Sequence, residues 1–350
     1  MNLMGQLKMG LGALLAVLGR RRPLNVMASV TDHCPSRCSY CRIPEQNRPD
    51  LSTEVWMDLI TQMRKAGTQR IGVWGGEPLT RPDIVELCRH MRKLGIYVSI
   101  DTNGYLLPDR PEIMDHADHL VLAFDGPREA HDANREEGSF DKAVRAFETA
   151  SGRIRLWSIT VLTKHNLDHL DYIMRTADRY GFLTTFQTLH HNELLGGDTS
   201  SMMPTREEYS KALMKLSRMK RNGAPIANSV RYLESLAGWP DYSRTRLERA
   251  YHGVSCKAGR AYCNVDVDGR VYPCSLLIGT YPEALNALEV GFERAFKATA
   301  ELPCQACTAS CYTEYNYLYG LSPGVGLEWH RAVRRTDRAM KEHARGKEQL

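Results

Sequence analysis

The sequence predicts an α/β fold, a partial (β/α)6 TIM-like barrel followed by a cysteine-rich C-terminal extension. About six strand-like segments alternate with helix-like segments over residues 24–190, which is typical of parallel βαβ units. Turn residues follow several of these strands, at the edge where parallel barrels gather their chemistry. Nine of the ten cysteines fall within residues 34–41 and 256–311, a clustering that packing alone does not require.

The length of 350 residues is enough for a barrel-sized domain with an appendage. We expect an N-terminal amphipathic or apolar helix over 1–22, the barrel over 23–200, a helical bridge over 201–255, a cysteine-rich region over 256–320 and a C-terminal helix over 321–350. Hydrophobic residues make up 43% and charged residues 25%, as in ordinary soluble proteins. The net charge of +5 is spread along the chain without a dedicated nucleic-acid-binding motif, so we expect no nucleic acid partner.

The first apolar segment, Met9–Leu18, is too short to span a bilayer. It lacks a convincing cleavage site and is followed by Arg20–Arg22, which argues against a signal peptide. Two interpretations stay open, a helix packed on its own protein and a helix that lies on a membrane.

The barrel elements follow in order. Predicted strands are Leu24–Val30, Arg70–Trp74, Ile96–Thr102, His119–Phe124, Ile154–Leu162 and Leu183–Leu189. Between the first two, Ser52 can cap a helix that ends at Gly67, with its apolar residues on one stripe. Further helices are predicted from about Pro82, from Ser139 and from Asn166, and a last helix covers Leu327–His343.

The first cysteine group, Cys34, Cys38 and Cys41, has the spacing C-x3-C-x2-C in the loop after the first strand. Thiolates are soft ligands that suit zinc or iron–sulfur clusters. Three of them can hold three irons of a [4Fe–4S] cube and leave the fourth iron open. A structural zinc site needs a fourth ligand, and the adjacent His33 is poorly placed to supply it. The spacing therefore favours iron–sulfur.

The run CPSRCSYC, with the aromatic Tyr40 before its third cysteine, resembles the signature of the radical S-adenosylmethionine (SAM) superfamily. The resemblance covers residues 24–190. It implies a [4Fe–4S] cluster whose open iron binds SAM, reductive cleavage of that cofactor, and a 5′-deoxyadenosyl radical that abstracts a hydrogen atom from the substrate. It also implies a reductase partner such as flavodoxin or ferredoxin.

The same resemblance implies a set of SAM contacts at the strand ends. In GGEP, Glu77 and the neighbouring backbone would hold the methionine amino group, and Arg135 would pair with the cofactor carboxylate. The implied residues are Tyr40, Gly75, Gly76, Glu77, Pro78, Asn103, Asp125 and Arg135. Ala123 departs from the pattern, because many relatives carry a serine there. Taken singly, such Gly, Asn and Asp residues could also merely make turns.

The second cysteine group resembles the opening of the family's twitch or SPASM auxiliary-cluster extensions, on the run DGRVYPC that ends at Cys274. Its members are Cys256, Cys263, Cys274, Cys304, Cys307 and Cys311. Asp268-Gly269 predicts a hairpin turn. A full SPASM extension uses seven cysteines for two clusters, and Thr313 stands where a further ligand is expected, so we expect one auxiliary [4Fe–4S] cluster. Two ligand sets stay open, Cys256/Cys274/Cys304/Cys307 and Cys256/Cys263/Cys274/Cys311, and a zinc ribbon is the competing interpretation.

The substrate is less constrained. No peptide-recognition domain precedes Cys34 and the N-terminal segment is apolar, so we expect a hydrophobic or lipid-like small molecule. The alternative is a maturase of a ribosomally made peptide. A non-catalytic iron–sulfur or zinc protein is the hypothesis of another class. His190, His191, Glu193 and Tyr315 are candidates for a base or hydrogen donor. Oxygen-sensitive clusters favour the cytoplasm, with peripheral membrane contact left open.

Overall fold

The computed structural model describes residues 21–348 apart from 191–195, 197–198, 252 and 254. An eight-stranded sheet has the order β6-β5-β4-β3-β2-β1-β8-β9, and its first seven strands are parallel neighbours. The six barrel strands are β1 (Asn25–Ser29), β2 (Arg70–Trp74), β3 (Tyr97–Thr102), β4 (His119–Ala123), β5 (Arg155–Leu162) and β6 (Leu183–Thr188). The predicted six-unit partial barrel is confirmed.

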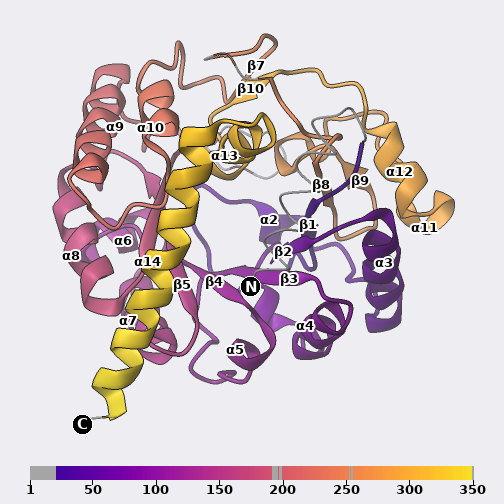
Figure 1. The fold of residues 1–350 in the computed structure, drawn as a ribbon, viewed down its shortest axis with the longest axis horizontal. Helices are drawn as coiled ribbons and strands as arrows, with labels where there is room; N and C mark the ends of the chain where they lie inside the picture. The colour runs from indigo at the N-terminus through magenta and orange to yellow at the C-terminus, as the bar shows by residue number, and fades with distance from the viewer. Residues whose placement is uncertain (1–20, 191–195, 197–198, 252, 254, 349–350) are drawn as a thin grey trace.

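Helices cover the outer face of this sheet (Figure 1). They are α3 (Thr53–Ala66), α4 (Ile84–Lys93), α5 (Ile113–His116), α6 (Arg128–Asn134), α7 (Ser139–Ala150) and α8 (Leu170–Tyr180), and the short α2 (Ile43–Gln46) lies in the cysteine loop. In α3, Ser52 caps the first turn by accepting a hydrogen bond from Val55 N, and Gly67 ends the helix at φ 108°. The buried face of α3, with Trp56 and Leu59 at its centre, packs into the main core.

The cysteine-rich region continues the barrel sheet. Strand β8 (Tyr262–Val265) pairs in parallel with β1, and β9 (Val271–Tyr272) turns back antiparallel to β8. The turn between them is the predicted hairpin, with Gly269 at φ 85°. Around it lie α11 (Ala287–Val290), α12 (Phe292–Ala298) and the small sheet of β7 (Arg246–Leu247) with β10 (Ala306–Cys307). The sequence predicted the hairpin, whereas its attachment to β1 was not anticipated.

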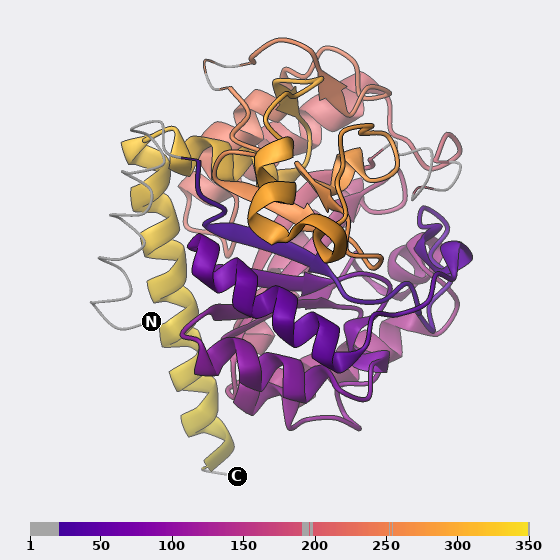
Figure 2. The same cartoon turned by 90° about the vertical axis from the view of Figure 1, so that its right-hand side faces the viewer.

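Four further helices complete the molecule. The predicted bridge contains α9 (Arg206–Arg221) and α10 (Val230–Ala237), and α13 (Ser310–Tyr319) leads into the long α14 (Pro323–Glu348). Helix α14 crosses the amino-terminal ends of the strands, where Asp337 pairs with Arg155 and Thr336 accepts a hydrogen bond from Trp157. Figure 2 shows α14 at one end of the barrel and the loop around α2 at the other.

The predicted N-terminal helix lies outside the described residues up to position 20. Arg21 and Arg22, which close that segment, are not helical. Arg21 instead donates hydrogen bonds to the carbonyls of Gly259 and Phe296, which attaches the chain start to the cysteine-rich region. Within the described part of the chain, no helix is long and apolar enough to cross a membrane.

Candidate cofactor and cluster sites

The first three cysteines lie in the loop that leaves the carboxyl end of β1. Ser36 contacts two of them, with its backbone nitrogen 3.4 Å from Cys34 Sγ and its hydroxyl 3.2 Å from Cys38 Sγ. Asn103, at the end of β3, donates to Cys34 Sγ at 3.6 Å. Burial raises the pKa of the Cys34 thiol to about 12 and that of Cys41 to about 11. These thiols would therefore ionise on binding metal rather than before it.

The chemistry of this loop fits an iron–sulfur cube. Its donors are three thiols with hydrogen-bond donors aimed at their sulfurs, and hydrogen bonds to sulfur are a general feature of such clusters. Among the described residues, no three His, Cys, Asp or Glu side chains are gathered closely enough to hold a single metal ion. A cube of four irons is larger than one ion and spaces its thiolates farther apart.

The predicted Gly-Gly-Glu-Pro segment packs directly against the cysteine loop. Gly76 N donates to Thr31 O at 2.7 Å, and Glu77 N donates to His33 O at 2.6 Å. A Cβ on Gly75 would lie 2.3 Å from Thr31 O, and one on Gly76 would lie 2.3 Å from His33 O. Only glycine permits this approach, because any side chain would displace the loop that carries Cys34.

The carboxylate of Glu77 is fully buried and turned into the protein. It accepts hydrogen bonds from Leu79 N at 3.0 Å, Thr102 Oγ1 at 2.7 Å and Asn103 N at 2.7 Å. Burial raises its pKa to about 7, against these hydrogen bonds. Glu77 thus ties the end of β2 to the end of β3 and holds Asn103 beside Cys34. Its contact with the methionine amino group stays a prediction.

Asp125 and Arg135 form a buried ion pair at the next strand ends. Arg135 Nε donates to Asp125 Oδ2 at 2.8 Å, and Asp125 Oδ1 accepts from Val161 N at 2.8 Å. Arg135 also directs Nη1 toward Cys38 Sγ at 3.8 Å and lies 5.8 Å from the ring centre of Tyr40. The structure therefore brings the predicted cofactor residues together around the cysteine loop. Pairing of Arg135 with the cofactor carboxylate stays a prediction.

The second cysteine group divides into four and two. Burial raises the pKa of Cys274, and the nearby Cys256, Cys307 and Cys304 raise it further. The pKa of Cys307 is likewise raised by burial and by the nearby Cys256 and Cys304. These four thiols therefore lie close to one another. The geometry favours the ligand set Cys256/Cys274/Cys304/Cys307.

The two remaining cysteines have different surroundings. Cys263 is fully buried among the apolar side chains of the main core, and burial alone raises its pKa. Cys311, on α13, has Asp101 and Arg70 as its charged neighbours. The placement of Cys263 gives no support to its predicted metal role. Cys311 packs against the same side-chain cluster as Cys256, and its role as a ligand stays a prediction.

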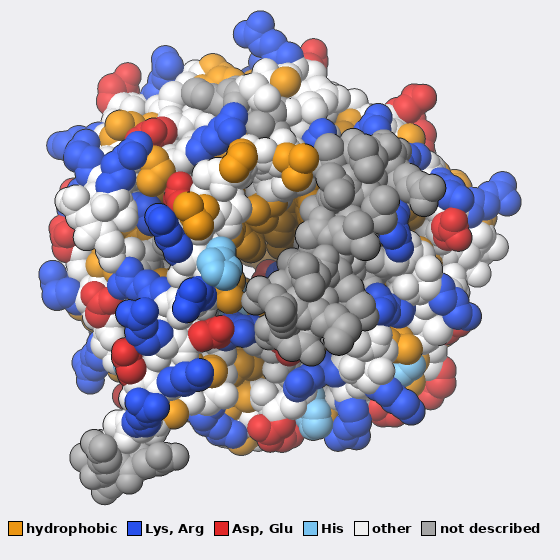
Figure 3. Space-filling view, viewed as in Figure 1, with side chains coloured by type: hydrophobic (Ala, Val, Ile, Leu, Met, Phe, Trp, Pro, Cys, Tyr) orange, Lys and Arg blue, Asp and Glu red, His pale blue; other side chains and the backbone are white. Residues whose placement is uncertain are grey.

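The interior of the barrel is partly open and is lined by both polar and apolar side chains. Along the strands, the outward-facing side chains are buried, whereas several inward-facing ones are partly exposed. These are Arg70, Trp74, Asp101, Val121, Ile159, Thr185 and Gln187. Because outer helices cover the sheet, partial exposure on the inner side means space within the barrel, which we call the chamber. Figure 3 shows the face at the amino-terminal ends of the strands hollowed beside α14, with hydrophobic side chains at the floor.

Charged groups stand inside this chamber. Arg70 donates to Asn25 Oδ1 at 2.7 Å and to Ser99 Oγ at 2.5 Å, and its guanidinium lies 5.8 Å from the ring centre of Tyr315 on α13. Burial raises the pKa of Asp101 to about 6, and Arg70 opposes that shift. The sequence analysis missed both residues. Charged side chains within otherwise apolar strands were the signal that could have found them.

The structure describes two of the four predicted candidates for a base or hydrogen donor. Tyr315 faces the chamber from α13. His190 follows β6, its pKa is lowered to about 4 by burial, and its Nε2 has no hydrogen-bond partner among the described residues. His191 and Glu193 lie outside the described residues.

Comparison with known proteins identifies the barrel. Residues 28–177 match the family model described as the radical SAM superfamily. PqqA peptide cyclase of Gluconobacter oxydans (strain 621H) is 28% identical over 266 residues, which cover 72% of this chain and 70% of the relative. The protein of the same name from Rhodopseudomonas palustris is 28% identical over 270 residues, covering 72% and 67%.

Solved structures show the same fold. Streptococcus suis SuiB bound to S-adenosylmethionine matches with a TM-score of 0.62 at 15% identity, over 79% of this chain and 66% of that one. The protein anSMEcpe with bound AdoMet matches with a TM-score of 0.58 at 18% identity, over 87% and 99%. This chain thus spans about two thirds of the length of SuiB.

The cysteine loop, the glycine-lined strand end beside it and the second cysteine group all agree with this match. Residues 28–177 thus form a radical SAM domain, and the chain is an enzyme that uses a [4Fe–4S] cluster and S-adenosylmethionine. Its second cysteine group resembles a twitch/SPASM auxiliary-cluster extension.

Proposed function

We propose that this radical SAM enzyme modifies a ribosomally made peptide by forming a covalent link within it. When bound, the cluster and SAM would supply the radical that abstracts one hydrogen atom. The second hydrogen would leave as a proton, which a carboxylate in the chamber can accept, and an electron, which the auxiliary cluster would take. The sequence favoured a lipid-like substrate because of its apolar N-terminus. The similarity to peptide cyclases supports the alternative instead.

The observation that carries the proposal is the set of polar groups inside the chamber. Asp101 lies on β3, two residues before Asn103, which contacts Cys34. The two residues are therefore about 7 Å apart along the strand direction. Across the barrel, Asn264 accepts a hydrogen bond from Trp74, and its buried Nδ2 has no partner among the described residues. A lipid chain would leave such groups desolvated at about 1–3 kcal/mol each, whereas peptide amides and polar side chains can pair with them.

Asp101 is the residue we propose to contact the substrate. Its carboxylate stands among Arg70 and Cys311 and can accept a hydrogen bond or a proton from a substrate N–H or O–H group. The four proposed ligands Cys256, Cys274, Cys304 and Cys307 would hold the auxiliary cluster, and Cys34, Cys38 and Cys41 the SAM cluster.

The test reconstitutes the full chain anaerobically with dithionite, SAM and the peptide encoded by a short reading frame beside the gene. We expect 5′-deoxyadenosine together with a peptide that has lost two hydrogen atoms, measured by mass spectrometry. Asp101→Asn should still cleave SAM but form product at least about 100-fold more slowly, because the substrate contact is changed. The exposed Asp109→Asn is the matched control. If 5′-deoxyadenosine formation responds to lipid extracts and to no such peptide, the peptide proposal is wrong.

A further inference from the structure

One phenol group reaches a cysteine of the second group. Tyr262, the first residue of β8, is 1% exposed, and its hydroxyl lies 3.4 Å from Cys256 Sγ. Its ring stacks on Tyr312 with centres 5.2 Å apart and planes 16° apart. The ring is therefore fixed by packing, and the hydroxyl has little freedom to leave the sulfur.

The same hydroxyl has a competing partner. It donates to Asn316 Oδ1 at 2.8 Å, and the backbone nitrogen of Lys257 donates to that oxygen at 2.8 Å as well. The Lys257 N–H can only donate, so it fixes which amide atom of Asn316 faces the phenol. When Cys256 is a thiolate, the single phenol proton has two acceptors, Asn316 Oδ1 and Cys256 Sγ. Cys256 also has hydrogen bonds with the Ala258 backbone and the Asn316 side chain, but the one with Tyr262 has the largest influence on its thiol.

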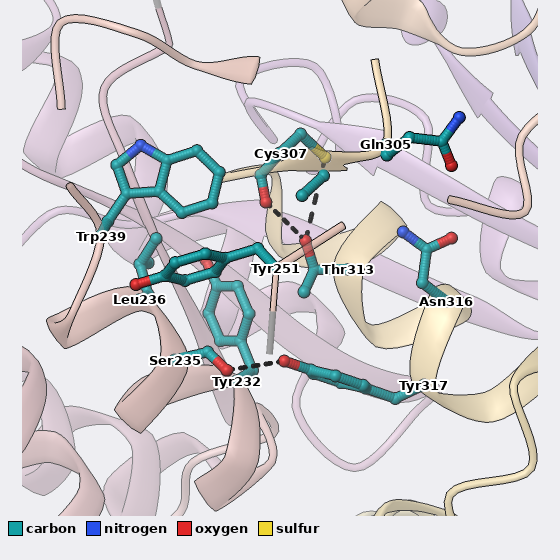
Figure 4. A pocket seen from close by; sticks show the side chains of 11 residues that line it. Tyr232, Ser235, Leu236, Trp239, Tyr251, Gln305, Cys307, Thr313, Asn316 and Tyr317 are labelled. Carbon is teal, nitrogen blue, oxygen red and sulfur yellow. Dashed lines mark hydrogen bonds between the residues drawn. The ribbon is translucent and has the colours of Figure 1, made fainter. Parts of the chain in front are cut away.

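The hydroxyl near Cys307 contributes less. Thr313 Oγ1 lies 3.8 Å from Cys307 Sγ but donates at 2.8 Å to the Cys307 carbonyl, as the dashed lines in Figure 4 show. Thr313, Cys307 and Asn316 also line a cavity of about 20 Å³ between α10 and α13, which has room for about one water molecule. Solvent therefore has little space to replace a hydrogen bond given by the protein.

We propose that Tyr262 is a positioning residue for the auxiliary cluster, and that it sets the reduction potential of that cluster by sharing its phenol proton between Cys256 and Asn316. The inference rests on Cys256 being a cluster ligand and is independent of the substrate. Hydrogen bonds to ligand sulfurs tune the potential of iron–sulfur clusters, because they stabilise the more negative reduced state. The hydrogen bond from Tyr262 therefore raises the potential.

The experiment measures the midpoint potential of the auxiliary cluster by EPR-monitored redox titration. It uses the full chain with Cys34, Cys38 and Cys41 replaced by alanine, so that only the auxiliary cluster remains. Tyr262→Phe keeps the stacked ring and should shift the potential to a more negative value. Tyr319→Phe removes a phenol from the same aromatic group, 6.5 Å from Tyr262 between ring centres, and should leave the potential unchanged.

Iron and sulfide counts on each variant show that the cluster is intact before potentials are compared. Equal potentials for Tyr262→Phe and its parent, at equal iron content, would overturn the proposal. So would a shift of the same size in Tyr319→Phe, because the effect would then belong to the aromatic group in general. If the parent itself holds no iron, Cys256 is not a ligand and the inference fails, while the peptide test above is unaffected.

Discussion

His119 is a buried imidazole at the start of β4, inside the barrel. Its ring meets Trp157 edge to face at 4.8 Å, and its Nε2 has no hydrogen-bond partner among the described residues. Burial lowers its pKa to about 3, and the nearby Arg70 and Arg155 lower it further. The folded protein therefore keeps this imidazole neutral under conditions in which the unfolded chain protonates it.

This difference predicts a pH-dependent loss of stability. Between the unfolded pKa of about 6.5 and the folded value, the unfolded state binds one more proton, so the free energy of unfolding decreases as the pH falls. His119 should contribute a loss of about 1.4 kcal/mol for each pH unit below 6.5. Urea unfolding at pH 7.5 and 5.5 should show a smaller loss in His119→Gln than in wild type. The exposed His330→Gln should follow wild type, and a His119 variant that also does so would contradict the assignment.

Arg48 joins three elements around the cysteine loop. It follows α2, pairs with Asp32 after β1 at 2.7 Å and reaches Asp266 after β8 at 2.6 Å. Both carboxylates are 1% exposed, so the guanidinium compensates two buried negative charges at once. The loop that carries Cys34, Cys38 and Cys41 is thereby attached at its far end to the auxiliary-cluster extension.

Removal of this arginine should be costly. Arg48→Met leaves Asp32 and Asp266 buried without a cation, and we expect the free energy of unfolding to fall by about 3–5 kcal/mol. The iron content of the SAM cluster should fall as well, because the loop loses its anchor. The control Arg42→Met removes an exposed pair with Glu45 at 3.9 Å and should cost less than about 1 kcal/mol. Equal effects of the two variants in chemical denaturation would show that Arg48 has no special role.

Local patterns were enough to predict most elements. The predicted strand Arg70–Trp74 coincides with β2, and the helix capped by Ser52 forms with its expected end at Gly67. Both predictions depend only on residues that are neighbours in the sequence. The pairing of Asn25 with Tyr262 depends on segments far apart in sequence, which spacing does not reveal.

The choice of cluster ligands among the C-terminal cysteines also depends on pairing between distant segments. On β8, Tyr262 faces the aromatic side chains of α13, so the next residue, Cys263, faces the outer core. Once that strand is known, alternation alone separates Cys263 from the other thiols. The sequence could not provide the strand's partner, and both ligand sets therefore stayed open.

At the scale of the whole molecule, the two cysteine groups lie toward opposite ends of β8. Asp266, beyond its carboxyl end, is tied to the SAM-cluster loop through Arg48, whereas Tyr262, at its start, contacts Cys256. Four strand residues span about 13 Å. Asp101 lies on β3, which β2 and β1 separate from β8 in the sheet order, and its neighbour Cys311 belongs to α13.

This arrangement predicts an iron stoichiometry. Reconstituted wild type should hold about eight irons per chain, and either Cys274→Ala or the triple Cys34/Cys38/Cys41→Ala variant about four. Cys263→Ala and Cys311→Ala should keep about eight, because neither thiol joins the proposed set. Iron and sulfide assays on the purified variants decide the matter. A halved iron content in Cys311→Ala would favour the second ligand set, and zinc in place of iron would contradict the auxiliary cluster.

The pairing of β8 with β1 also constrains how the chain is made. β1 leaves the ribosome before the other strands of this sheet, yet the strand that covers its free edge follows more than two hundred residues later. Until then, the nascent barrel presents a row of unpaired backbone groups, the kind of edge that recruits other chains. Synthesis therefore includes a long interval in which protection of that edge must come from something other than its final partner strand.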